Sequence, residues 1–163
     1  MTVIRGDAMP PIHDLLPHRD AMLLVDRALA GDASFIEVEC VVPSRGWHID
    51  SGEDAIAPGM PAWIGIELMA QAIAAHAGLL GSLAGQAPKR GLLLGSRDYS
   101  AAQGSFKAGD VLRIAAHISF RDDSGFGAYD CSITGPAGET AKATLKVFEP
   151  PDFDAFIRRP AAT

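Results

Sequence analysis

Glu67 and Gln71 are the polar residues that most need an explanation, because they interrupt a strongly apolar stretch of the sequence. Residues four apart share one face of a helix, so the carboxyl and the amide would be neighbours. A carboxylate in a buried helix is costly unless it is paired or has a task. A carboxyl group in apolar surroundings suits general acid catalysis. The alternative is a structural role, in which Glu67 bonds to backbone or to Gln71.

His48 is the second candidate for proton transfer, nineteen residues before Glu67. An imidazole has an unperturbed pKa of roughly 6.5, which suits a base near neutral pH. His48 is expected in a loop, where it is either catalytic or merely exposed. We interpret His76 as a satisfied core or interface histidine, and His18 as a structural hydrogen bonder near the end of a short helix.

One long helix over residues 61–84 must position Glu67 and Gln71. Pro61 suits a first helical position, and Gly85 suits a C-terminal stop. The helix would be about 36 Å long. It is apolar on nearly every face, which indicates burial inside a fold.

Alternating apolar and polar residues predict strands on both sides of this helix. A helical turn over 12–16, ended by Pro17, precedes them. The predicted strands cover 22–25, 33–42, 91–100, 111–120, 126–134 and 139–148, with 22–25 and 91–100 expected to be buried. An antiparallel sheet needs one face covered, and the long helix is the available cover. The fold class is therefore α+β, a curved antiparallel sheet wrapped around one central helix, and its uncovered helix face favours pairing with a second subunit.

The composition limits the classes of function. The 163 residues indicate one domain, with a core of about 12–149 and a mobile or edge tail over 150–163. A net charge of −6 argues against nucleic acid or anionic membrane as a partner. Cys40 and Cys131 lack metal-ligand spacing and are expected to be small core residues. Residues 1–11 have no apolar run typical of a signal peptide, so a cytoplasmic location is expected.

Three motifs resemble the β-hydroxyacyl-acyl-carrier-protein dehydratases of the hotdog fold. They are LLPHRDAMLLVDR at 15–27, ELMAQ at 67–71 and FKAGD at 106–110. The segment PAWIGIELMAQAIAA at 61–75 further resembles a subgroup associated with aryl-polyene and related polyketide-type clusters. The resemblance implies a hotdog fold, a dimer with two active sites at the subunit interface, and acyl-carrier-protein thioesters as substrates.

The resemblance also implies site residues. The family's motif HFPxHPxxPGxxxxE places Ala62 at a usual glycine and Glu53 at the usual histidine. A loop enlarged by five residues would instead bring in His48, and loops accept such insertions at small entropic cost. His48 of one subunit would then face Glu67 of the other.

Dehydration of a β-hydroxyacyl thioester needs a base, an acid and a group that stabilises the thioester oxygen. We assign the first two roles to His48 and Glu67, and Gln71 would orient the Glu67 carboxyl. The free backbone N–H groups near Ala62 and Trp63 would hold the oxygen. The acyl tunnel would be lined by Trp63, Ile64 and Leu68. This chemistry calls for no cofactor or metal.

Arg90, Arg97 and Lys107 form a possible basic rim for an acidic acyl carrier protein, unless they are scattered solvated charges. Two alternatives to the dehydratase remain open. One is a non-catalytic hotdog subunit that partners an active paralogue, and the other is a hotdog thioesterase in which Glu67 activates water. The chain is therefore expected to form a homodimer or a hetero-oligomer.

Overall fold

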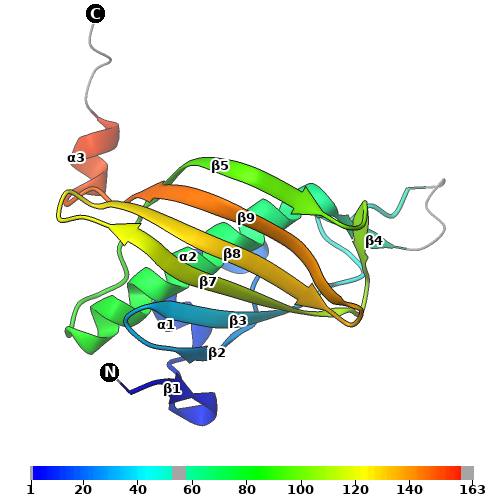
Figure 1. The fold of residues 1–163 in the computed structure, drawn as a ribbon, viewed down its shortest axis with the longest axis horizontal. Helices are drawn as coiled ribbons and strands as arrows, with labels where there is room; N and C mark the ends of the chain where they lie inside the picture. Colours follow the sequence, from blue (N-terminus) through cyan, green and yellow to red (C-terminus); the bar gives the residue numbers. More distant parts are fainter. Residues whose placement is uncertain (1, 53–57, 159–163) are drawn as a thin grey trace, which may run out of the picture.

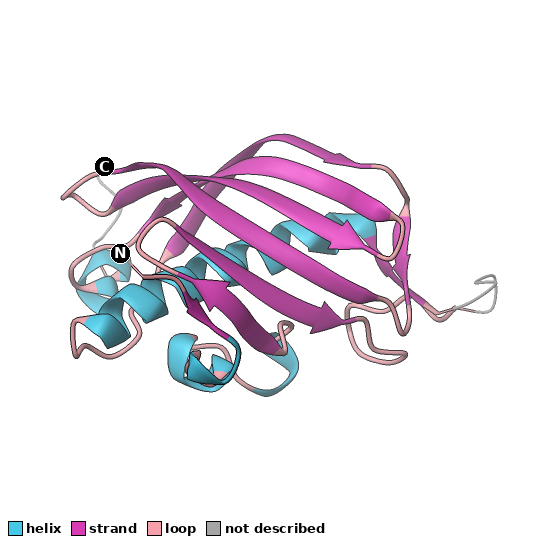
Figure 2. Ribbon diagram, turned by 60° about the horizontal axis from the view of Figure 1, so that its bottom comes forward, coloured by secondary structure: helices cyan, strands magenta, loops and turns pink. Residues whose placement is uncertain are grey.

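The computed structural model describes residues 2–52 and 58–158. Its main feature is an antiparallel sheet of seven strands that curves around one long helix, α2, as expected from the sequence (Figures 1 and 2). The strand order is β1-β2-β3-β7-β8-β9-β5. These strands are β1 (Ile4–Arg5), β2 (Arg27–Gly31), β3 (Phe35–Val41), β5 (Leu92–Ala101), β7 (Val111–Arg121), β8 (Phe126–Gly135) and β9 (Gly138–Phe148). A second, small sheet pairs β4 (Gly59–Pro61) with β6 (Ser105–Lys107).

The central helix confirms the predicted one closely. A 3-10 turn, Ala62–Ile64, runs directly into α2 (Gly65–Leu83). Gly85 has a φ of +70°, and its N–H donates to the Ser82 carbonyl, while the N–H of Gln86 donates to Gly81. This pair of bonds ends the helix in a Schellman motif, which explains the glycine. Ala62–Leu83 is long and apolar enough to cross a membrane, but most of it is buried, as in the core helix of a soluble protein.

The core lies between the concave face of the sheet and α2. Alternate residues of β3, β7 and β8 point toward the helix, for example Ile36, Ile114 and Ile133, and all three are fully buried. Helix α1 (Ile12–Leu15) packs on the opposite side of α2 and confirms the predicted helical turn. The two cysteines are free and buried, and burial raises the pKa of each thiol to about 12, so both behave as core residues.

The structure differs from the sequence prediction in several elements. The predicted strand over 22–25 is not formed. Met22 ends a 3-10 turn, Asp20–Met22, residues 23–26 are irregular, and the strand that follows is β2, which alternation did not reveal. Strand β5 is mostly exposed instead of buried, because it forms one edge of the sheet. A short 3-10 turn, Gly6–Ala8, follows β1.

The tail also differs from the prediction. It begins with a docked helix, α3 (Phe153–Ile157), where a mobile or edge segment was predicted. The Asp152 side chain caps this helix by accepting from the N–H of Ala155 at 2.9 Å. Phe156 packs edge-on against Phe148, with ring centroids 5.3 Å apart. These contacts hold α3 against the end of β9.

Candidate active site

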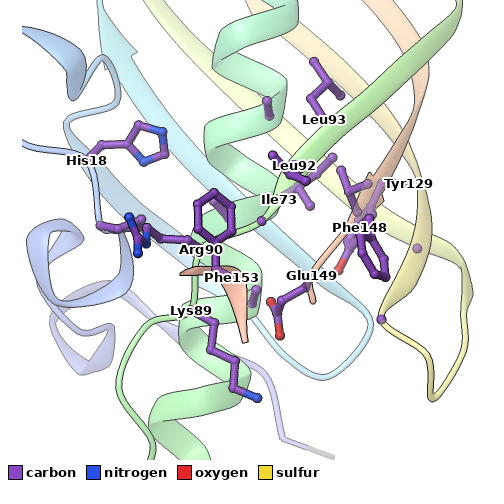
Figure 3. Close-up of a pocket in the computed structure, with 18 of the residues that line it drawn as sticks. His18, Ile73, Lys89, Arg90, Leu92, Leu93, Tyr129, Phe148, Glu149 and Phe153 are labelled. Carbon is purple, nitrogen blue, oxygen red and sulfur yellow. The ribbon is translucent and has the colours of Figure 1, made fainter. Parts of the chain in front are cut away.

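A cavity of about 370 Å³ lies between one face of α2 and the ends of β5, β8 and β9 (Figure 3). The helix contributes Glu67, Ala70, Ala74 and Ala77 to its wall. These positions are spaced by three or four residues and share one face of the helix. Ten residues of helix separate the first from the last, so the cavity follows the helix for about 15 Å. Its walls are largely apolar.

Glu67 places its carboxylate in this cavity. The Gln71 amide donates to Glu67 Oε1 at 3.0 Å, which is the neighbour relation expected from the spacing. Glu67 is not as buried as the sequence suggested, because its side chain borders an open cavity and is 37% exposed. The carboxylate is therefore held from one side by an amide and open to a ligand on the other.

Gln71 is fully buried and bonded to three partners. Besides Glu67, its amide nitrogen donates to the carbonyl of Met22 at 2.7 Å, and its oxygen accepts from the N–H of Leu24 at 2.9 Å. These bonds join the central helix to the segment that follows His18. Gln71 consequently positions both the carboxylate and the neighbouring loop.

His18 is the imidazole that the chain itself places beside Glu67. His18 Nε2 lies 3.9 Å from Glu67 Oε1, and both residues line the cavity. The sequence favours a structural role for His18, because no local spacing relates it to Glu67. The link depends on how α1 packs against α2, which a one-dimensional pattern does not reveal.

His48 lies elsewhere in the chain and does not line this cavity. Its ring is half-buried beside Trp47, with centroids 5.1 Å apart, and burial lowers its pKa below the ordinary value. The Trp47 indole N–H donates to the carbonyl of Ala21, which fixes this part of the loop. Glu53, which the motif aligns with the usual histidine, falls outside the described residues. The predicted approach of His48 to Glu67 across two subunits stays a prediction.

The residues predicted to contact the substrate do not lie together around the cavity. The N–H of Ala62 donates to the Gly104 carbonyl at 2.9 Å, so this donor is already used. Trp63 follows in the first turn, where backbone N–H groups lack partners within the helix, and its side chain is 66% exposed. Ile64 and Leu68 point into the core and do not line the cavity, since Leu68 lies about 100° around the helix from Glu67. Ala70, Ile73, Ala74 and Ala77 line it instead.

The basic residues divide into two groups. Arg90 borders the cavity, donates to Asp154 of α3 at 2.5 Å and lies 4.5 Å over the Phe153 ring. Arg97 on β5 and Lys107 on β6 are exposed and do not border it. Sequence reasoning missed Lys89 and Arg121, which do.

His76 makes two buried hydrogen bonds, one of them to Tyr129, which lines the cavity. His76 Nε2 lies 2.8 Å from the Asp32 carbonyl, which can only accept, so Nε2 carries the proton. His76 Nδ1 therefore accepts from the Tyr129 hydroxyl at 3.1 Å. Burial lowers the pKa of His76, which matches its predicted role as a satisfied core histidine. The described residues contain no cluster of His, Cys, Asp and Glu able to hold a metal ion.

Comparisons with known proteins identify the fold and the family of the chain. The dehydratase heterocomplex ApeI:P from Xenorhabdus doucetiae superposes with a TM-score of 0.82, at 23% identity, over 93% of this chain and 99% of that chain. The E. coli PaaI protein from the phenylacetic acid degradation operon superposes with a TM-score of 0.56, at 15% identity, over 77% and 78%.

A hypothetical thioesterase from Streptococcus pneumoniae, solved with coenzyme A, superposes with a TM-score of 0.51, at 19% identity, over 72% and 79%. These structural similarities show that this chain has the hotdog fold. No curated protein sequence matches the chain. The model of the ApeP-like family, described as ApeP dehydratase, matches residues 10–158. Since this match covers nearly the whole chain, the protein belongs to the ApeP-like dehydratase family.

Proposed function

We propose that this dehydratase removes water from β-hydroxyacyl groups carried as thioesters on an acyl carrier protein, giving trans-2-enoyl thioesters. The observation that carries the proposal is the position of Glu67. Its carboxyl opens into a largely apolar cavity along α2 and is held by the buried Gln71 amide. An acyl chain fits an apolar wall, and the carboxyl at one end meets the β-hydroxyl.

Glu67 acts as the general acid in this proposal. Its protonated form donates to the departing hydroxyl, so that the C–O bond breaks with release of water and not of hydroxide. Gln71 keeps the carboxyl turned toward the cavity through the 3.0 Å bond. The base must be an imidazole or a carboxylate within reach of the α-carbon, and the family motif offers His48 of a second subunit for this role.

The carrier protein and the assembly are further parts of the proposal. Lys89 and Arg90 border the cavity and would meet an acidic carrier protein at its mouth, with Arg97 and Lys107 further out. Arg90 already binds Asp154, so a carrier carboxylate would compete with α3 for it. The ApeI:P structure is a heterocomplex, which supports assembly of this chain with a hotdog paralogue.

The test is the variant Glu67→Gln, with Glu139→Gln, at an exposed position of β9, as its control. Glutamine keeps the shape of the side chain and its contact with Gln71 but cannot give up a proton. We expect turnover of a β-hydroxyacyl thioester to fall by roughly 10²–10⁴-fold, with unchanged thermal melting. A fully active Glu67→Gln variant would make this carboxyl structural.

The non-catalytic subunit is a second candidate, favoured by the heterocomplex and by the absence of His48 from the cavity wall of one chain. In that case turnover requires the paralogue, and Glu67→Gln leaves the activity of the complex unchanged. A hotdog thioesterase would release a free acid in place of the enoyl product. Analysis of the product by mass spectrometry separates these outcomes.

A further inference from the structure

His18 shares the cavity with Glu67 and needs no second subunit to reach it. We propose that the His18 imidazole is the catalytic base of this chain and that it forms a proton-transfer pair with Glu67 of the same chain. The inference rests on the proposed dehydration and names a different base from the one the family motif offers. Figure 3 shows His18 at the edge of the cavity, across from Tyr129 and Phe148.

The distance between the two groups fits a shared substrate. At 3.9 Å, His18 Nε2 and Glu67 Oε1 are too far apart for a direct hydrogen bond. They are close enough for both to reach neighbouring carbons of one ligand, or to be bridged by one hydroxyl. The side chains are 28% and 37% exposed, so each is sheltered but open to the cavity.

The fold holds His18 firmly in this position. The Arg19 guanidinium donates to the carbonyls of Leu16 at 2.5 Å and of His18 at 2.7 Å, which fixes the turn after α1. Leu16 is fully buried, and Gln71 fixes the segment on the other side of the turn.

Like the His48 ring, the His18 ring has one buried nitrogen, Nδ1, without a hydrogen-bond partner among the described residues. A ring held only for structure would be expected to satisfy this atom. The other nitrogen, Nε2, is the one near the carboxyl. The ring therefore presents its reactive edge to the cavity.

These two groups account for both proton transfers of the reaction. His18 Nε2 takes the α-proton, and the electron pair of the C–H bond is held as the thioester enolate. This pair then forms the double bond between the α- and β-carbons. The bond from the β-carbon to oxygen breaks, and the oxygen keeps that electron pair, takes the proton of the Glu67 carboxyl and leaves as water. The imidazolium then returns its proton to the Glu67 carboxylate, which restores both groups.

The experiment separates proton removal from loss of water. The full-length chain, in the assembly in which it is active, is incubated in D₂O with a 3-hydroxyacyl pantetheine thioester. Deuterium entering the α-position of recovered substrate reports the base, and the enoyl product reports the complete reaction. The variants are His18→Gln, His48→Gln and Glu67→Gln, with His13→Gln as a control, because His13 is exposed and outside the cavity.

We expect His18→Gln to lower kcat by at least about 100-fold with little change in KM, and to stop α-deuterium incorporation. Glu67→Gln should lose product formation but keep exchange, and the control His13→Gln should keep both. Exchange at the wild-type rate in His18→Gln, or its loss in His48→Gln alone, would overturn the inference. A folded wild-type protein that yields no enoyl product overturns the proposed function itself. His18→Asn serves in the same comparison if the glutamine variant does not fold.

Discussion

Gln71 is the residue on which both the carboxylate and the loop after His18 depend. Its buried amide bonds to Glu67, Met22 and Leu24. Gln71→Met would fit the space but would leave the Leu24 N–H and the Met22 carbonyl without this partner. Each buried polar group that loses its partner costs about 1–3 kcal/mol.

We therefore expect Gln71→Met to lower the free energy of unfolding by roughly 2–5 kcal/mol in urea denaturation. Gln86→Met, at an exposed position after the helix, is the matched control and should change it little. Equal stability of the two variants would contradict the positioning role of Gln71.

His76 makes the stability of the fold depend on pH. Burial holds its pKa below 6.5, so the folded protein keeps this ring neutral where the unfolded chain would protonate it. Unfolding then takes up a proton, and stability falls as the pH drops below about 6.5, by at most about 1.4 kcal/mol per pH unit from this group. The loss continues until the pH passes the lowered, folded-state pKa.

His76→Gln should reduce the change in unfolding free energy between pH 7 and pH 5. This holds whether or not the variant is less stable than the wild type at pH 7. The measurement is the slope of the unfolding free energy against pH, compared with His13→Gln. Burial also lowers the pKa of His48, so part of the slope should remain in the variant. An unchanged slope would mean that His76 does not titrate between the two states.

At the scale of single residues, the sequence predicts contacts between residues that are close together in the chain. Glu67 and Gln71 are one helical turn apart, so their contact followed from spacing. His18 and Glu67 are brought together by the packing of α1 on α2, and nothing in the spacing of two residues so far apart reveals it. The motif resemblance led instead to His48, which the single chain keeps out of the cavity wall.

At the scale of elements, the crossing of α1 and α2 positions His18, and it depends on Gly78. A Cβ at Gly78 would overlap the backbone carbonyl of Leu15. We expect Gly78→Ala to lower the unfolding free energy by roughly 3 kcal/mol or more, although alanine favours the helix by about 1 kcal/mol.

Gly81→Ala in the same helix is the control, because its Cβ would meet Gln86 O at an ordinary 3.4 Å. It should be neutral or slightly stabilising in the same denaturation experiment. If both alanine variants are equally stable, the two helices do not need the close approach.

Alternation located the long strands because one face of the sheet packs on α2. β3, β7, β8 and β9 follow this pattern. β2 was missed because its sequence, RALAG, carries small residues with little contrast between its faces. β5 was predicted as buried from its leucines, but strand order decides burial, and order is a property of the whole sheet.

At the scale of the whole molecule, β5 leaves a ten-residue edge strand largely open. Exposed edges of this length invite pairing with another chain. Leu93 and Leu94 on this strand are 42% and 50% exposed, and the Trp63 ring is exposed at the start of the central helix. Burial of such a surface is typical of a stable subunit interface.

We expect the chain to sediment at micromolar concentration as a dimer, or as a complex with a hotdog paralogue when the two are produced together. Leu94→Glu should shift it toward monomer, because a carboxylate on the edge strand would be desolvated in the interface. Val111→Glu is the control: Val111 is similarly exposed but lies on β7, which is flanked by β3 and β8 and offers no free edge. A well-folded wild-type monomer would exclude any site shared between subunits, whereas a site built from His18 and Glu67 of one chain would survive that result. Sedimentation combined with turnover of Leu94→Glu therefore tells whether assembly is needed for catalysis or only for stability.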